Sequence, residues 1–229
     1  MPASSPIDWF PLWLSLRVSS IATLLVLGIG TLIAYLLSHK EFRGKALLDS
    51  VITLPLVLPP TVLGYYLLVL VGRTSPLGRL YETIVGQPLV FTWQAAVVAA
   101  FLHSAPIYIK AARAVLETVD FRYEWVSYSL GASEWRTFWR VTLPLARRGL
   151  ASLATLSFAR SLGDFGVTIM VAGNIPGRTQ TLSVAIYDAV ESGNGRLARV
   201  LVIVVSVLAV ALLWPATHVS RTPRLSSAA

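Results

Sequence analysis

The sequence predicts an all-α, polytopic membrane helical bundle with about five transmembrane helices and a helical loop on the cytoplasmic side. Of its 229 residues, 55% are hydrophobic and only 13% are charged, which is unusual for a water-soluble domain of this size. Long uncharged runs alternate with short groups of Lys and Arg. A globular chain this short could not cover so many uncharged helices with its own polar surface, so we interpret the runs as membrane spans.

Five segments approach or exceed the roughly 20 residues that an apolar helix needs to cross the hydrocarbon core. They cover about residues 14–37, 51–72, 89–109, 149–172 and 198–217 of a single domain, residues 1–229. The first run is too long for the apolar part of a signal peptide and no basic segment precedes it, so we expect it to remain in the mature protein. Pro55, Pro59 and Pro60 remove backbone donors from the second segment, which predicts a break there, packed against other helices or a cavity.

The basic residues predict the orientation. If the spans alternate, one side receives Lys40, Arg43, Lys45, Lys110, Arg113, Arg122, Arg136, Arg140, Arg147, Arg148, Arg221 and Arg224. The other side receives Arg73, Arg79, Arg178 and Arg196, with Arg199 at a span edge. Cytoplasmic segments carry the excess of Lys and Arg, which places the N-terminus outside and the C-terminus in the cytoplasm. This dispersed distribution also argues against nucleic acid as the partner behind the net charge of +8.

The cytoplasmic loop 110–148 is too long for a simple turn and has a helical pattern of its own. Residues 123–130 predict a short helix ended by Gly131, and Ser133 can cap a second helix. In that helix Trp135, Phe138, Trp139 and Thr142 share one face until Pro144 interrupts the pattern. From the residues alone, this element fits either a helix resting on lipid headgroups or a docking helix for a cytoplasmic partner.

The motifs of several enzyme classes are missing. The sequence has no phosphate-binding loop for ATP, no metalloprotease or serine-hydrolase motif, and no cysteine. Its three histidines, His39, His103 and His218, belong to separate segments, which excludes a helical metal pair at i, i+4. We therefore expect a non-catalytic chain that binds neither a cofactor nor a metal.

Charged residues inside the membrane are the remaining site candidates, because each is costly there. Arg160 and Asp164 stand one helical turn apart in the fourth segment. They could form a buried structural pair, or they could border a translocation path in which Arg160 attracts an anion. The pathway candidates are Arg160, Ser161, Asp164, Pro59, Pro60 and Thr61. Arg17, just before the uncharged part of the first span, is interpreted as an interfacial residue that reaches toward the headgroups.

Two stretches of the loop resemble the cytoplasmic loop of ABC importer permeases, with its pattern of E-A-A, three residues, Gly, nine residues and I-x-L-P. They are Glu124-Trp-Val-Ser-Tyr-Ser-Leu-Gly131-Ala-Ser and Val141-Thr-Leu-Pro144. The spacing from Gly131 to Val141 is that of the family, whereas Glu124 stands one residue early. The resemblance implies a coupling helix that docks on an ATPase subunit, with Glu124, Gly131, Ala132, Ser133, Val141, Leu143 and Pro144 as the coupling residues.

Four further segments resemble the molybdate branch of oxyanion importers: residues 39–45, 54–66, 159–166 and 172–181. The resemblance implies a type I ABC importer permease for molybdate in the bacterial inner membrane. It also implies a homodimer, two ATPase subunits that carry ATP and Mg, and an external substrate-binding protein. Tungstate and sulfate permeases remain alternatives, and a secondary oxyanion transporter or a membrane enzyme is a more distant one.

Overall fold

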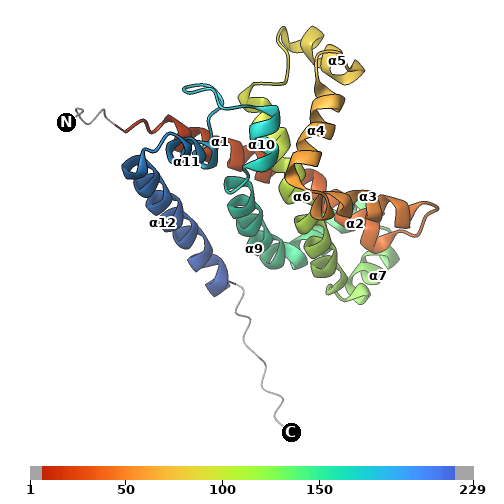
Figure 1. Cartoon of the computed structure of the whole chain (residues 1–229). Helices are drawn as coiled ribbons and strands as arrows, with labels where there is room; N and C mark the ends of the chain where they lie inside the picture. Colours follow the sequence, from red (N-terminus) through yellow and green to blue (C-terminus); the bar gives the residue numbers. More distant parts are fainter. Residues whose placement is uncertain (1–6, 220–229) are drawn as a thin grey trace.

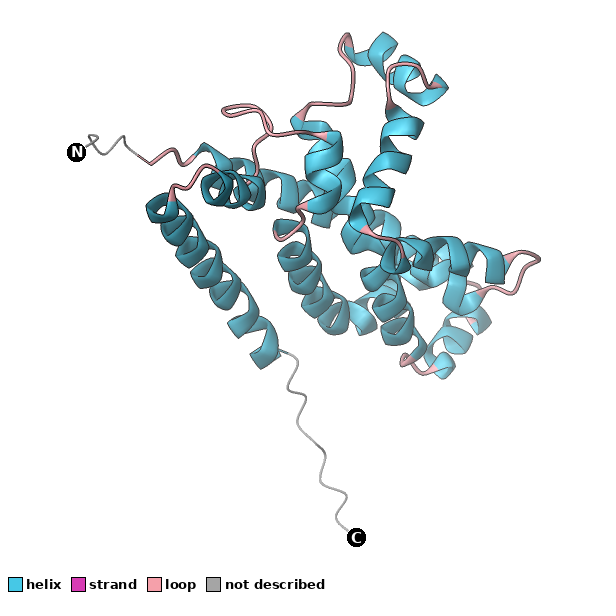
Figure 2. Cartoon of the chain, viewed as in Figure 1, coloured by secondary structure: helices cyan, strands magenta, loops and turns pink. Residues whose placement is uncertain are grey.

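The computed structural model describes residues 7–219, and in this part of the chain all regular structure is helical, as predicted (Figures 1 and 2). The first helix runs without a break through α1 (Phe10–Leu25), a π-helical turn (Val26–Gly30) and α2 (Thr31–His39), and it covers the first expected span. Gly30 allows a close approach to α6, because a Cβ there would lie 2.9 Å from Cδ1 of Tyr108.

The second expected span is two helices, α3 (Lys45–Val57) and α4 (Pro60–Val71), followed by α5 (Pro76–Val85). The break predicted from the prolines is therefore confirmed, and Pro60 occupies a first-turn position where its missing N–H is not needed. Helix α4 packs along α10, and α5 lies at the outer end of α4 (Figure 1). Where α4 meets the bundle, a Cβ on Gly64 would lie 2.5 Å from Cβ of Met170, so the two backbones pack closely.

The long helix α6 (Trp93–Glu117) is the centre of the bundle and packs against α1, α2, α3, α9 and α10. Its first half presents alanines to the core, and Ala96 and Ala99 are fully buried. Small side chains of this kind let neighbouring helices approach closely. A small residue also lets α9 approach α6 closely, because a Cβ on Gly149 would lie 2.6 Å from Cγ1 of Val115.

The polar loop forms α7 (Phe121–Ser129) and then a continuous helix made of α8 (Glu134–Thr137), a π-helical turn (Phe138–Thr142) and α9 (Leu143–Leu162). The expectation that Pro144 interrupts the helical pattern is wrong. Pro144 lies at the start of α9, directly after the wider π turn, and turns of this kind accommodate a proline ring within a helix.

The chain continues through α10 (Gly166–Val171), α11 (Leu182–Glu191) and α12 (Gly195–Val219). The fourth expected span is broken between α9 and α10 by Gly163, Asp164 and Phe165. By length and apolarity, three described helices can cross a membrane: Phe10–His39, Trp93–Glu117 and Gly195–Trp214. The count of five spans stays a prediction, and Arg221 and Arg224 lie outside the described residues.

Candidate functional site

The turn between α7 and α8 is built as the sequence predicts. Gly131 has φ +79°, the left-handed conformation that glycine adopts without strain. Its N–H bonds Tyr128 O at 2.9 Å, and the N–H of Ala132 bonds Ser127 O at 3.1 Å, the pair of bonds that closes a helix end. The Ser133 side chain then caps α8 by accepting from the N–H of Arg136. This part of the predicted coupling element is therefore a rigid turn between two helices.

Glu124 lies inside this element, since only 1% of the residue is exposed. Its Oε1 accepts a hydrogen bond from Thr142 Oγ1 at 2.5 Å and lies 3.1 Å from Nε2 of His39 at the end of α2. Burial, and next the negative charge of Glu124, raise the pKa of Tyr128. The carboxylate therefore ties α7 to the first helix and to the start of α9, and it is not available on the outer surface.

The predicted face of the second helix is only half correct. Phe138 and Thr142 are buried, whereas Trp135 and Trp139 are 58% and 50% exposed. The buried side is instead completed by Thr137, whose hydroxyl lies 2.8 Å from that of Ser127 on α7. The two tryptophans are exposed, together with Arg136 and Arg140. Among the predicted coupling residues that follow, Val141 and Leu143 are partly buried and Pro144 is exposed.

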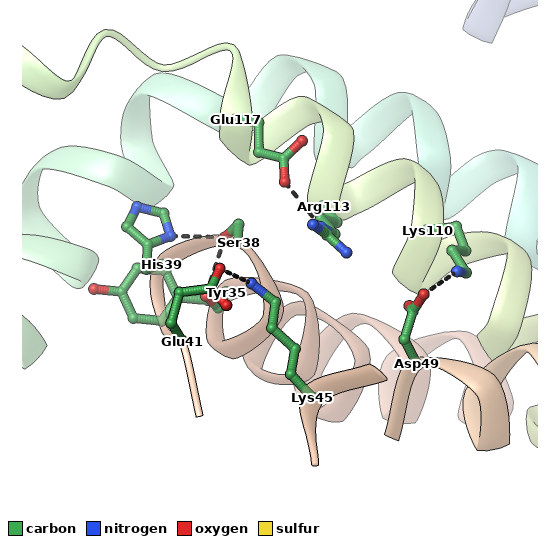
Figure 3. Close-up of polar contacts among 9 residues, drawn as sticks. All are labelled: Tyr35, Ser38, His39, Glu41, Lys45, Asp49, Lys110, Arg113 and Glu117. Atoms are coloured by element: carbon green, nitrogen blue, oxygen red, sulfur yellow. Dashed lines mark hydrogen bonds and ion pairs between the residues drawn. The ribbon is translucent and has the colours of Figure 1, made fainter. Parts of the chain in front are cut away.

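Ion pairs join the segments at this end of the bundle. Lys110 on α6 donates to Asp49 on α3 at 2.7 Å, and Lys40 after α2 donates to Glu134 on α8 at 2.6 Å. Figure 3 shows the first of these pairs beside two local ones, Arg113 with Glu117 and Lys45 with Glu41. The basic segments after the first span and before the fourth therefore meet at the same end of the molecule.

The two helix breaks lie next to each other. A Cβ on Gly166, where α10 begins, would lie 2.5 Å from Cβ of Pro60, where α4 begins. Pro59, Pro60 and Thr61 are exposed at this corner. The structure thus brings the two groups of pathway candidates, one from each broken segment, to neighbouring positions.

Arg160 and Asp164 do not form the structural ion pair that their spacing allowed. The helix ends at Leu162, and Asp164 Oδ2 accepts from the N–H and the hydroxyl of Thr168 at 3.2 and 2.6 Å. The other carboxylate oxygen, Oδ1, is buried without a hydrogen-bond partner in the described chain and lies 3.8 Å from Nδ1 of His103. Asp164 therefore holds the break between α9 and α10 in shape.

Arg160 points elsewhere, into a cavity of about 170 Å³ between α6 and α9. Beside it the lining includes Ser104, Tyr108 and Ser157, and the apolar residues Ile107, Leu153 and Leu156. The hydroxyls of Ser104 and Tyr108 already bond Ala100 O and Thr31 Oγ1, and Ser161 donates to Ser104 Oγ at 3.1 Å. The guanidinium group of Arg160, which is exposed, is therefore the group in this space that suits an oxyanion.

Four residues of these sites are not among those predicted from the sequence: His103, Ser104, Tyr108 and Thr168. Each is a polar side chain inside an apolar run, and that alone is the signal that could have singled them out. Their partners lie on other helices or across the break, so the contacts follow only from the fold.

Apolar helices long enough to span a membrane, two neighbouring helix breaks and a polar helical loop define a polytopic membrane protein. Residues 26–224 match the family described as binding-protein-dependent transport system inner membrane component. The match spans most of the chain, so this protein belongs to that family.

Relatives that match most of the length of this chain include molybdenum transport system permease proteins. The molybdenum transport system permease protein ModB of Escherichia coli (strain K12) is 45% identical over 209 residues, covering 90% of this chain and 91% of that protein. ModB of Azotobacter vinelandii is 41% identical, covering 84% of each. Sulfate permease 2, chloroplastic, of Chlamydomonas reinhardtii is 36% identical over 81% of this chain and 50% of that protein.

Solved structures share the fold at low sequence identity. A structure of the MetNI methionine ABC transporter in an inward-facing conformation has a TM-score of 0.70 at 18% identity, covering 95% of this chain and 100% of that chain. A bacterial transporter that imports alginate has a TM-score of 0.69 at 16% identity, covering 94% of this chain and 79% of that chain. These similarities confirm the predicted fold class, a type I importer permease.

Proposed function

We propose that this chain is the transmembrane permease subunit of an ATP-driven importer that moves molybdate across the bacterial inner membrane. The observation that carries the proposal is the 45% identity to a molybdenum permease over 90% of this chain and 91% of that one. The sulfate permeases are less similar, at 36% identity over 81% of this chain and at 32% over 93% of it. Molybdate is therefore favoured over sulfate, and tungstate, the closest chemical analogue, stays the alternative.

The chain works as a homodimer with two ATPase subunits on the cytoplasmic side and a binding protein outside. Its own sequence has no nucleotide-binding loop, so ATP and Mg belong to the ATPases. The exposed surface of α8 and the following π turn, with Trp135, Arg136, Trp139 and Arg140, is free to dock on them. Movement of the docked loops would switch the path between its two orientations.

The orientation follows from the same elements: N-terminus outside, C-terminus in the cytoplasm. Its support is the meeting of two basic segments at the end of the bundle that carries α7 and α8, through the pairs of Lys110 with Asp49 and Lys40 with Glu134. An end so rich in Lys and Arg fits the cytoplasmic face.

The translocation path runs past the neighbouring helix breaks, with Arg160 as the residue that attracts the anion. Its support is the exposed guanidinium group of Arg160 beside the cavity between α6 and α9, and the exposed corner at Pro59, Pro60 and Thr61. Ser161 and Asp164 shape this region from within, through Ser104 and Thr168 respectively.

The decisive experiment is uptake of labelled molybdate into proteoliposomes that hold this chain, its ATPase and its binding protein. We expect uptake that requires all three proteins and ATP, and that tungstate inhibits while sulfate does not. Inhibition by sulfate at equal concentration would reassign the substrate to sulfate. Uptake without the ATPase would instead identify a secondary transporter and contradict the proposal.

A further inference from the structure

A second cavity, of about 400 Å³, lies at the opposite end of the bundle from the coupling loop. Its lining residues are Phe10, Trp13, Leu14 and Arg17 of α1, Trp93 of α6, and Gly177 and Arg178 of the loop between α10 and α11. Because α1 and α6 both begin here and both belong to helices able to span a membrane, we expect the cavity at one membrane surface. It combines an aromatic wall with two arginines.

The loop that carries Arg178 is held in a fixed shape. Thr179 Oγ1 accepts from the N–H of Ile175 at 3.2 Å, and Gln180 Nε2 donates to Asn174 Oδ1 at 2.8 Å. The end of the loop is tied to α1, since the N–H of Leu182 donates to Ser15 Oγ at 2.7 Å. Arg178 belongs to this loop and Arg17 to α1, so two exposed arginines line one cavity from segments that are tied together.

Arg17 is fixed by an aromatic contact that leaves its donors free. Its guanidinium carbon lies 3.9 Å from the ring centroid of Trp93. Stacking of this kind occupies a face of the guanidinium group, whereas the N–H donors lie in its plane and point outward. The side chain is therefore oriented without being neutralised.

In the part of the chain that the structure describes, neither arginine has a carboxylate partner. Within residues 7–219, the ion pairs shorter than 4.0 Å involve neither Arg17 nor Arg178. The acidic residue that contacts this loop, Asp188, already accepts hydrogen bonds from Asn174 and Gln180. Two positive charges thus line one cavity with their hydrogen-bond donors unused.

We propose that this cavity binds a tetrahedral oxyanion group through Arg17 and Arg178. Paired guanidinium groups match the oxygens of such a group in charge and in donor geometry. The aromatic wall of Phe10 and Trp13 and the place at the membrane surface favour the phosphate of a phospholipid headgroup, whose acyl chain would lie on that wall. A free oxyanion arriving from solvent offers the same chemistry to the arginines. The site does not depend on which anion the protein transports.

The test compares two double variants of the complete transporter complex, purified in detergent. Arg17→Gln with Arg178→Gln removes both proposed ligands. Arg79→Gln with Arg196→Gln is the matched control, because it removes two exposed arginines predicted on the same side of the membrane and outside the cavity. Binding of phosphatidylglycerol is titrated by native mass spectrometry, and binding of labelled molybdate and sulfate, without the binding protein, is measured by equilibrium dialysis.

We expect the Arg17 and Arg178 double variant to bind the lipid about tenfold more weakly, while the control stays within about twofold of the unmodified complex. A loss confined to the lipid titration identifies a headgroup as the natural occupant, and a loss confined to dialysis identifies a free oxyanion. Equal binding by all three proteins, equal losses in both variants, or no binding of any probe by the unmodified complex would overturn the proposal. Unchanged co-elution with the ATPase shows that each variant is folded.

Discussion

At the level of single residues, Glu124 is the acidic residue of the coupling motif, but its carboxylate contacts groups inside the molecule. It stands one residue before the family position, and its carboxylate is buried against Thr142 and His39. A carboxylate in this position fixes the distance between the coupling loop and the first helix. Its contribution is therefore to stability and geometry, and the exposed residues of α8 remain for contact with a partner.

Glu124→Ala would leave the hydroxyl of Thr142 and the ring of His39 without their acceptor in a buried place. An unsatisfied buried polar group costs about 1–3 kcal/mol, so we expect a lower free energy of unfolding and a lower melting temperature. Glu134→Ala, which removes only the exposed partner of Lys40, is the control and should cost less than about 1 kcal/mol. Thermal unfolding in detergent measures both, and equal melting temperatures for the two variants would contradict the internal role.

Arg160→Gln tests the pathway at residue scale. The glutamine keeps a polar side chain in the cavity but removes the charge that would attract the anion, so we expect transport to fall by about tenfold, the size of one charge-assisted contact. Binding of the ATPase should not change. The control is Arg196→Gln, at an exposed site in α12. Wild-type uptake by a normally assembled Arg160→Gln complex would remove Arg160 from the pathway.

Residue-scale features were predictable where the signal is local. Gly131 and Ser133 end one helix and begin the next through backbone geometry that involves only nearby residues, and both are as predicted. The partners of Glu124 and Asp164 were not predictable in this way. Glu124 meets His39 across 85 positions of sequence, and Asp164 lies in a helix break that redirects its side chain toward Thr168.

At the level of helices, the sequence predicts which segments are apolar better than it predicts where a helix is interrupted. Residues 51–72 and 149–172 are apolar enough to be expected as spans, but each contains a break in the structure, one at Pro59 and one at Gly163 to Phe165. Hydropathy measures how apolar the side chains of a segment are, and it does not indicate whether the backbone forms one continuous helix. The prolines indicated the first break, whereas the second depends on Gly166 packing against Pro60.

Gly64→Ala tests the close packing of α4 on α10. The added methyl group would lie 2.5 Å from Cβ of Met170, so the helices must separate or the side chain must shift. Overpacking of this kind costs about 1–3 kcal/mol. Gly28→Ala adds the same methyl group within the first helix where nothing lies within 4 Å, and it serves as the control. A melting temperature lowered only by Gly64→Ala is expected, and equal values would contradict close packing at this contact.

At the level of the whole molecule, the two ends of the bundle have different chemistry. One end carries the coupling loop and the ion pairs of α2, α3, α6 and α8, and the other carries the aromatic cavity with Arg17 and Arg178. From the positions of Lys and Arg, the sequence predicted that the basic segments gather on one side, because charge distribution is a property of segments; it did not predict the aromatic cavity at the other end. Which residues pair at each end required the fold.

Gly131→Val tests assembly of the complete transporter. A branched side chain at φ +79° is strained by about 1–3 kcal/mol, so the turn between α7 and α8 should lose its shape. We expect less ATPase to co-purify with the variant, and Gly131→Asn, which tolerates this conformation better, should retain more. Full co-purification of the ATPase with Gly131→Val would show that the shape of this turn is not needed for ATPase binding.

The unbroken helix from Glu134 to Leu162 is long enough to transmit a rotation from one end of the helix to the other. At 1.5 Å per residue it is about 40 Å long, with the exposed tryptophans near one end and the break at Gly163 at the other. Tilting a rod of that length by about 10° displaces its far end by about 7 Å. A rotation of the helix about its Trp135 end would thus reach Asp164, at the break, as a shift larger than the radius of a tetrahedral anion.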